Sequence, residues 1–415
     1  MSIYSINTKF FLFCSCYHFS RRQLESPVTN QSQQDYNELT NIIDVLANHT
    51  VKDSLQGATV NLSSTVTATS TAKTIAATCL NQERRNIVLI KVHKAASTTA
   101  VAIIERYGYK HNMTLAVKAP TRFGPHILSS SGKFQRKMVH QWQRGYNLLT
   151  NHVRYNRTEM NAVVPNATYV TIIRDPVKHF ESAFSYFLVP KHLDIHGRPD
   201  PMAAFFEQPE EYLKQKFYFW FQLRSGQIFD LGLDHVDHTG AKVAALIQHV
   251  RRHFDLVMLA DHFDESLLLL RKHLCLDWRD ILYILDNFRT AKQKMNISEE
   301  VRKHIEVWNW ADMTLYHHFL HVFWDKVRDY GAGFQEDLAH FRRLLDETRD
   351  NCTTGRITRK AHDAHGVRTL QLRKDASGAC KDLLLGDVDY TRMFRERQDK
   401  YLYDLPKHWV ELKDG

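Results

Sequence analysis

The strongest constraint on the fold is a pattern that occurs three times: a short apolar run followed directly by a segment with helical periodicity. The runs cover residues 87–92, 169–173 and 256–260, and each is rich in Val, Ile or Leu. Runs of this length and composition are typical of strands that are buried on both faces of a parallel sheet. Strands that alternate with helices predict an α/β fold, with a central parallel sheet flanked by helices.

Helical periodicity follows each apolar run. After the first run, apolar positions recur at helical spacing over residues 98–107, and Gly108 is predicted to end that helix. After the third run, a helix is expected over residues 263–274. A further helix with many aromatic residues is expected over residues 308–330.

The second apolar run is followed by a helix with a clear start signal. Asp175 can cap this helix, and Pro176 stands where the first helical residue belongs. Phe180, Phe184 and Phe187 then fall on one helical face. We expect these three rings in the hydrophobic core rather than at a ligand.

The loop after the first apolar run is the strongest candidate site. It comprises residues 91–99, and Lys91, Lys94 and three hydroxyl side chains lie within it. Ligands of parallel α/β proteins bind beyond the carboxyl ends of strands, and the start of a helix offers N–H groups and a positive dipole end. The loop is therefore predicted to bind an anion. The glycine-rich patterns of nucleoside-triphosphate and dinucleotide sites are absent.

Two segments of the chain resemble a known family. Residues 91–99 resemble the 5′-phosphosulfate-binding loop of the Golgi galactose-3-O-sulfotransferases, and residues 172–187 resemble that family's 3′-phosphate-binding strand and helix. Shorter similar stretches are residues 151–157, 229–232 and 263–267, within a resemblance that covers about residues 79–324. The resemblance implies a P-loop-like sulfotransferase fold and transfer of a sulfuryl group to the 3-hydroxyl of a terminal β-galactose. It also implies 3′-phosphoadenosine 5′-phosphosulfate as the co-substrate.

Sulfuryl transfer is an in-line displacement at sulfur, and it suggests roles for three residues. Positioning and charge stabilisation should supply most of the catalysis, by analogy with phosphoryl transfer. Lys94 is therefore predicted to stabilise negative charge on the leaving phosphate. His93 is predicted to be the general base, since a neutral imidazole can accept the proton of the sugar hydroxyl. His152 is the second candidate, as the base or as a contact to the acceptor.

The donor site is predicted to span both strand ends. The planar guanidinium of Arg174 suits the 3′-phosphate, and Ser182 resembles the family's hydroxyl donor to that phosphate. The cradle for the 5′-phosphosulfate is predicted to comprise Lys91, Lys94, Ala95, Ala96, Ser97, Thr98 and Thr99. The family tends to carry Thr where Val92 stands, and Thr or a similar residue where Ala95 stands. Backbone amides are therefore expected to supply more of the binding here.

Two features favour a lumenal protein. Acceptor triplets for N-glycosylation occur at Asn30, Asn48, Asn61, Asn112, Asn156, Asn166, Asn296 and Asn351. Residues 10–19 form an apolar run with basic neighbours, but a transmembrane helix needs about 20 apolar residues. The run is either a signal-peptide core, a truncated signal anchor or the product of an incorrect first exon. The resemblance implies a single-pass type II protein of the Golgi membrane, anchored through this segment.

Composition divides the chain into four parts. Residues 1–24 form the N-terminal signal or anchor segment. Residues 25–78 are rich in Ser, Thr and Asn and are predicted to form a flexible stem, because they cannot bury enough apolar surface to fold. Residues 79–352 are predicted to form the lumenal sulfotransferase domain, and residues 353–415 an extension packed on it.

The cysteines do not indicate a metal site. Cys79, Cys275, Cys352 and Cys380 lie in the body of the chain, and four cysteines permit three pairings between which the sequence does not choose. No Cys or His cluster with zinc spacing occurs, so no metal is expected.

The charge and motifs limit the partners. A net charge of +9 suits an anionic ligand. No nucleic-acid-binding motif accompanies this charge, so a nucleic-acid partner is not expected. The expected partner is a galactose-terminated glycolipid or glycan. The alternatives are a sulfotransferase for another sugar of a glycosaminoglycan and a lumenal glycan-binding relative without turnover. The sequence does not determine the oligomeric state, and a homodimer is one possibility.

Overall fold

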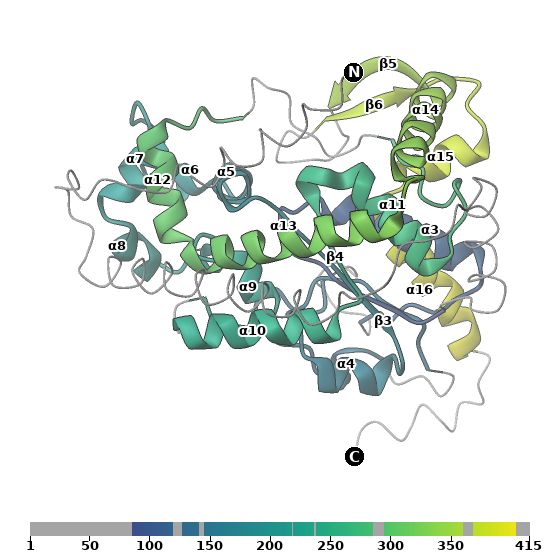
Figure 1. Ribbon diagram of the computed structural model, residues 1–415, viewed down its shortest axis with the longest axis horizontal. Coiled ribbons are helices and arrows are strands. Elements are labelled where there is room, and N and C mark those ends of the chain that lie inside the picture. Colours follow the sequence, from purple (N-terminus) through teal and green to yellow (C-terminus); the bar gives the residue numbers. More distant parts are fainter. Residues whose placement is uncertain are drawn as a thin grey trace, which may run out of the picture.

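Four parallel strands form the central sheet of the structure, a computed structural model (Figure 1). The structure describes residues 85–118, 127–140, 145–217, 219–235, 238–284, 294–359 and 368–403. The strands of this sheet are β1 (Ile87–Ile90), β2 (Leu148–Leu149), β3 (Thr168–Ile173) and β4 (Leu256–Leu259), in the order β2-β1-β3-β4. Every neighbouring pair is parallel. The predicted α/β fold with a central parallel sheet is confirmed.

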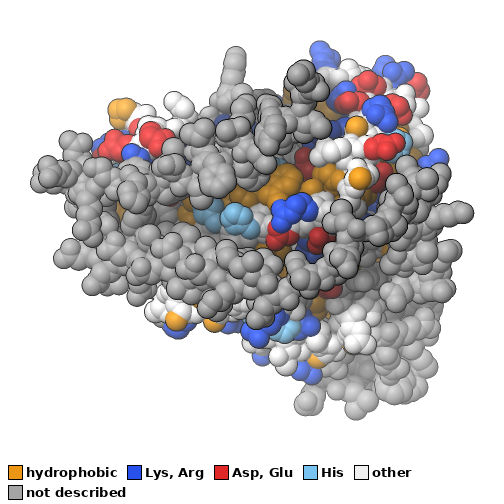
Figure 2. All heavy atoms as spheres, in the orientation of Figure 1, with side chains coloured by type: hydrophobic (Ala, Val, Ile, Leu, Met, Phe, Trp, Pro, Cys, Tyr) orange, Lys and Arg blue, Asp and Glu red, His pale blue; other side chains and the backbone are white. Residues whose placement is uncertain are grey.

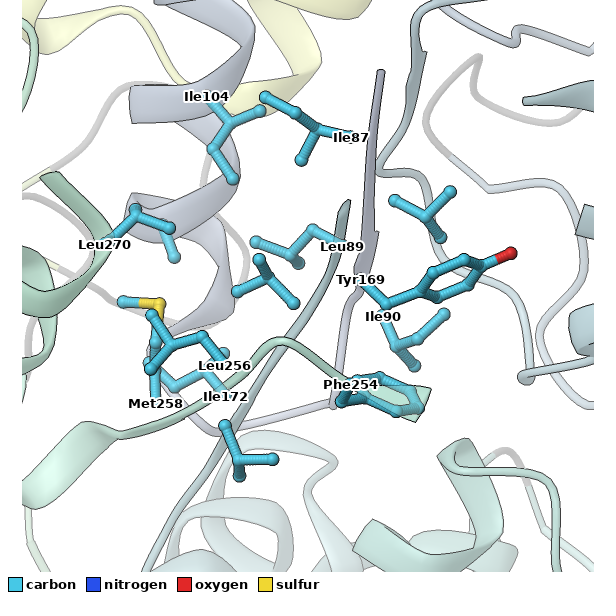
Figure 3. Close-up of a cluster of buried hydrophobic side chains, with 14 of the residues drawn as sticks. Ile87, Leu89, Ile90, Ile104, Tyr169, Ile172, Phe254, Leu256, Met258 and Leu270 are labelled. Atoms are coloured by element: carbon cyan, nitrogen blue, oxygen red, sulfur yellow. The ribbon is translucent and has the colours of Figure 1, made fainter. Parts of the chain in front are cut away.

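Both faces of the sheet are buried. Figure 3 shows Leu89 of β1 on the side of Ile104 and Leu270, which belong to two flanking helices, whereas Tyr169 and Phe254 lie together on the other side. Every residue of the four strands is buried. Continuous apolar runs, rather than alternating ones, are what such a sheet requires.

The first helix is longer than predicted. Helix α3 spans Ser97–Lys110 and therefore runs through Gly108, so the prediction that Gly108 ends it is wrong. A Cβ atom on Gly108 would lie 2.4 Å from Cδ1 of Leu148. This glycine thus allows α3 to approach β2 closely.

The second helix begins as predicted. Helix α5 spans Pro176–Tyr186, with Pro176 in its first turn, and the Asp175 side chain accepts a hydrogen bond from the backbone N–H of Lys178. The three phenylalanine side chains predicted for the core, Phe180, Phe184 and Phe187, are buried in a second hydrophobic cluster. The third predicted helix is confirmed as α11 (Phe263–Leu274).

The aromatic-rich segment predicted over residues 308–330 is confirmed as a helix that begins two residues later than predicted. Helix α12 (Glu299–Trp308) ends and α13 (Trp310–Tyr330) begins at Asn309. The Asn309 side chain accepts from the backbone N–H of Ser225 and donates to the carbonyl of Ile305. Tertiary hydrogen bonding at this asparagine therefore accompanies the start of α13.

The remaining helices and strands surround this core. The helices are α4 (Arg157–Val163), α6 (Val189–His192), α7 (Pro201–Glu207), α8 (Pro209–Lys214), α9 (Gly226–Asp230), α10 (Gly240–His253), α14 (Phe334–Cys352), α15 (Gly378–Leu384) and α16 (Asp387–Tyr403), with short 3-10 turns at Arg136–Met138, Trp220–Gln222 and Ala260–His262. An antiparallel hairpin of β5 (Thr353–Arg359) and β6 (Arg368–Leu372) follows α14. Figure 1 shows α13 lying across the sheet, with α7, α8 and α12 gathered at one end of the molecule. Figure 2 shows hydrophobic and histidine side chains gathered on the face over α13.

The C-terminal part of the described chain is tied to the rest. Cys352 and Cys380 form a disulfide, and Cys275 is also disulfide-bonded. Helix α16 packs along α3, and the Gln398 amide makes hydrogen bonds to both the N–H and the carbonyl of Leu115. Phe394 of α16 is fully buried in the main core. The segment after Cys352 thus contributes to the same core as the sheet.

The predicted N-terminal segment and stem, residues 1–78, lie outside the described residues. Within the described part of the chain, no helix is long and apolar enough to cross a membrane.

Candidate active site

The carboxyl ends of β1 and β3 lie side by side and bring the two predicted donor-binding segments together. Ile90 pairs with Thr171 in the register of these strands. The chain leaves β1 into the loop that precedes α3, and it leaves β3 through Arg174 and Asp175 into α5. Parallel strands end at the same edge of a sheet, so the two segments meet there.

The loop before α3 has a backbone suited to an anion. Lys94 and Ala96 have φ angles of 54° and 59°, in the left-handed region that non-glycine residues seldom adopt. Ala96 occupies the N-cap position of α3 and provides no side-chain cap. The first N–H groups of a helix have no intrahelical acceptor, and alternating left- and right-handed residues turn successive N–H groups inward. The start of α3 can therefore receive an anion.

The cradle residues differ in their exposure. Ala95 and Ser97 are buried, and the Ser97 hydroxyl donates to the carbonyl of Val92 at 2.6 Å, which closes the loop on itself. Thr98 and Thr99 are partly exposed in the first turn of α3. The Ser97 hydroxyl thus has an internal acceptor, whereas its backbone belongs to the helix start.

Lys94 and Arg174 lie close together. The Arg174 Nη1 donates to the carbonyl oxygen of Lys94 at 3.1 Å, and the Lys94 ammonium lies 3.2 Å from the centre of the Tyr186 ring. Both side chains are partly exposed. The structure therefore brings two cations, one from each strand end, to the same edge of the sheet.

His93 is held by a carboxylate. Its Nδ1 lies 2.9 Å from Oδ2 of Asp230, and its backbone N–H donates to the same oxygen at 2.8 Å. The Gln222 amide donates to Oδ1 of Asp230 at 3.2 Å. A carboxylate at Nδ1 favours the tautomer with the proton on that nitrogen, which leaves Nε2 as a proton acceptor. This is the arrangement that a general base requires.

The second candidate base lies against the first. The rings of His93 and His152 are stacked, with centroids 4.1 Å apart and planes inclined by 17°. His152 follows β2, so the insert between the first two strand–helix units contributes directly to the site. The structure thus places both predicted histidines at one point and does not separate their roles.

A third histidine lies behind His93. His179 of α5 is buried, and its Nε2 lies 3.0 Å from the carbonyl oxygen of His93. Burial, with a contribution from Arg174, lowers the pKa of His179 to about 3, so its ring is neutral and donates to that carbonyl. His179 therefore supports the loop rather than carrying charge.

Lys91 has a different environment from Lys94, which is partly exposed. Lys91 is buried, and its ammonium forms an ion pair with Asp387 at the start of α16. Glu105 lies nearby, fully buried, and burial together with Asp387 raises its pKa well above its usual range. Ser182 is also buried, on α5. Donor contacts by Lys91 and Ser182 stay predictions.

Several residues of the site were not predicted. Asp230, Gln222 and Gln227 are buried polar side chains that contact His93, Asp230 or Arg174, and none had been given a role. Asp230 belongs to the stretch 229–232 that resembles the family, which was the one signal available for it. Among the described residues, no group of three or more His, Cys, Asp or Glu side chains could hold a metal ion.

The geometry of this edge of the sheet defines a class of protein. An uncapped helix start with two cations beside it, at the carboxyl edge of a parallel sheet, is an arrangement that binds phosphate-like anions. The profile of the galactose-3-O-sulfotransferase family matches residues 27–391 of the chain. The chain therefore belongs to the galactose-3-O-sulfotransferase family.

Individual relatives agree with this assignment. Galactosylceramide sulfotransferase of Bos taurus is 37% identical over 281 residues, which are 66% of this chain and 65% of the relative. Galactose-3-O-sulfotransferase 3 of Homo sapiens is 34% identical over 348 residues, 76% of this chain and 78% of the relative. Galactose-3-O-sulfotransferase 2 of Sus scrofa is 34% identical over 260 residues, 59% and 62% respectively. The chain thus spans 65% of the length of the galactosylceramide sulfotransferases that it matches.

Proposed function

We propose that this protein transfers a sulfuryl group from 3′-phosphoadenosine 5′-phosphosulfate to the 3-hydroxyl of a terminal β-galactose on a glycolipid or glycoprotein glycan. The family membership and the names of the relatives support the galactose acceptor. The single observation that carries the proposal is the His93–Asp230 pair beside the uncapped start of α3. A proton acceptor beside a site suited to a phosphate-like anion is what the proposed reaction requires.

The donor would be held by the loop and by Arg174. The backbone N–H groups at the start of α3 would take the 5′-phosphosulfate, and the guanidinium of Arg174 would take the 3′-phosphate, because its fork matches phosphate geometry. The donor supplies an activated sulfuryl group on a phosphate that can leave. Lys94, in the left-handed loop, would stabilise the charge that develops on that phosphate.

His93 would take the proton of the galactose hydroxyl. In this step the hydroxyl oxygen forms the new S–O bond, the S–O bond to the phosphate breaks, and the hydroxyl proton passes to Nε2. Asp230 at Nδ1 stabilises the imidazolium that forms. His152, stacked on His93, would contact the acceptor or share this role.

The test is an acceptor panel with the full chain and radiosulfur-labelled donor. We expect incorporation into galactosylceramide, lactosides or galactose-terminated disaccharides, and none into uronosyl acceptors. Incorporation into uronosyl acceptors alone would identify a glycosaminoglycan sulfotransferase. Binding of a galactoside with no release of adenosine 3′,5′-bisphosphate would identify a binding protein without turnover.

The lumenal Golgi location, with an N-terminal anchor, is part of the same proposal. Four acceptor asparagines of the described chain are exposed: Asn112, Asn166, Asn296 and Asn351. At Asn156, by contrast, the side-chain amide donates to the carbonyl of Phe134. In protein made by eukaryotic cells, Asn166→Gln should remove a glycosidase-sensitive mass increment, and Asn156→Gln should not. A protein with no glycosidase-sensitive mass would count against the lumenal location.

A further inference from the structure

We propose that α9 is the element that positions both halves of the site, with Gln227 acting on Arg174 and Asp230 acting on His93. This inference rests on the proposed function for the roles of Arg174 and His93. Helix α9 contains only Gly226–Asp230, and both positioning side chains are almost completely buried. Neither would touch the donor or the acceptor, so both are positioning residues.

The side-chain amide of Gln227 forms hydrogen bonds to both the N–H and the carbonyl of Arg174. Its Oε1 accepts from the Arg174 N–H at 2.8 Å, and its Nε2 donates to the Arg174 carbonyl at 2.9 Å. This pair of bonds fixes the direction in which the chain leaves β3. The Arg174 guanidinium in turn donates to the carbonyl of Lys94, so Arg174 connects Gln227 to the loop before α3.

Asp230 lies one helical turn further along and points to the other strand end. Its carboxylate binds both the ring Nδ1 and the backbone N–H of His93. One carboxylate thus contacts both the ring and the backbone of His93 and favours the tautomer with the proton on Nδ1, where the Gln222 amide nitrogen also lies 3.2 Å away. Only two residues lie between Gln227, which contacts the arginine, and Asp230, which contacts the histidine.

The two ends of α9 are held by the rest of the protein. At its start, the Asp312 carboxylate of α13 accepts from the N–H groups of Gln227 and Ile228, at 3.1 and 2.9 Å. At its end, the Arg154 guanidinium donates to the carbonyl of Phe229 at 2.8 Å. A short helix that is anchored at both ends can transmit a defined geometry to the site.

Gly226, the first residue of α9, shows how closely this helix packs against Gln222 and His179. A Cβ atom on Gly226 would lie 2.6 Å from Oε1 of Gln222 and 3.3 Å from Cε1 of His179. Gln222 contacts Asp230, and His179 contacts the carbonyl of His93. The α9 backbone therefore forms part of the support behind the proposed base.

Because the two side chains act on different groups, their loss should have different kinetic consequences. Gln227→Met keeps the shape of the side chain but removes both bonds to Arg174. It should weaken binding of adenosine 3′,5′-bisphosphate by about 10-fold or more, while kcat at saturating donor falls by less than about 3-fold. Asp230→Asn should leave that Kd within about 2-fold and lower kcat by about 10²–10⁴-fold, because the base loses its favoured tautomer.

The experiment combines calorimetric titration with adenosine 3′,5′-bisphosphate, steady-state kinetics and nitrogen NMR of labelled histidines in the full chain. His93→Gln assigns the His93 signals, which should report the Nδ1–H tautomer in wild type and lose it in Asp230→Asn. Gln371→Met, an exposed glutamine on β6, is the matched control and should change neither Kd nor kcat. If Gln227→Met does not fold, Gln227→Glu serves instead, since it keeps the acceptor for the Arg174 N–H but loses the donor.

The outcomes separate this inference from the proposed function. An unchanged Kd in the Gln227 variant, or an unchanged His93 tautomer in Asp230→Asn, would overturn the role of α9. Wild-type protein that binds the bisphosphate but sulfates no galactoside would overturn the proposed function, and the titration and the NMR would still decide whether α9 positions the two groups.

Discussion

A side chain at position 232 should lower the free energy of unfolding for two separate reasons. The φ angle of Gly232 is +96°, where an L-residue is strained by about 1–3 kcal/mol. A Cβ atom there would also lie 2.8 Å from the backbone carbonyl oxygen of Tyr155. The Tyr155 N–H is bonded to the carbonyl of Asp230, so this backbone cannot retreat without disturbing the end of α9. Forced overpacking of this kind adds about 1–3 kcal/mol.

Gly331 provides the control for the first part. It has the same φ of +96°, but nothing lies within 4 Å of a Cβ atom built there. We expect Gly232→Ala to reduce the free energy of unfolding by about 2–6 kcal/mol and Gly331→Ala by about 1–3 kcal/mol. The difference between the two variants measures the contact with Tyr155.

Urea unfolding at one temperature provides the assay, with the midpoints compared at equal m-values. Gly232→Ala should also lower transfer activity under conditions where it remains folded, because Gly232 follows Asp230 by two residues. Equal losses of stability in the two variants would refute the reasoning, since the close approach to Tyr155 would then contribute nothing.

Three further results are expected. Lys94→Ala should lower kcat by about 10²–10³-fold, because in the proposed mechanism this ammonium stabilises the charge on the leaving phosphate; near-normal turnover would remove Lys94 from the mechanism. Lys91→Met should destabilise the fold by about 3–5 kcal/mol in urea unfolding by removing the ammonium that pairs with the buried Asp387 carboxylate, and Lys91→Met with Asp387→Leu should restore most of that loss. Burial raises the pKa of Asp312 from 3.8 to about 7, so the folded chain holds this proton more tightly and loses stability as the pH rises through about 7; Asp312→Asn should weaken that dependence in unfolding measured from pH 5 to 8.

The strand–helix units could be predicted because their signals are local. Continuous apolar runs indicated β1, β3 and β4, and the Asp175–Pro176 start indicated α5. Strand β2 has only two residues and carries no periodicity of its own. Its position depends on its pairing with β1, which residues elsewhere in the chain determine.

The candidate loop could be predicted because topology alone brings the ends of parallel strands together. The partners of its side chains could not, because they are distant in sequence and buried on folding. Asp230 follows His93 by 137 residues, and Asp387 follows Lys91 by 296. A sequence does not distinguish a buried carboxylate from an exposed one. The desolvation that perturbs a buried carboxylate depends on the residues that pack around it in the fold.

The different fates of Lys91 and Lys94 follow from the alternation of a strand. Side chains two residues apart point to the same face, so Lys91 continues the face of Ile87 and Leu89, which Figure 3 shows turned toward α3. Helix α16 packs on α3 and supplies Asp387 there. Lys94 lies beyond the strand, where a left-handed backbone has already changed the direction of the chain. On these positions, Lys91 stabilises the end of the strand within the core, whereas Lys94 contacts the anion. The double replacement at Lys91 and Asp387 should therefore keep the Kd for adenosine 3′,5′-bisphosphate close to that of wild type. A large loss of bisphosphate binding in that stable double variant would instead return Lys91 to the donor site.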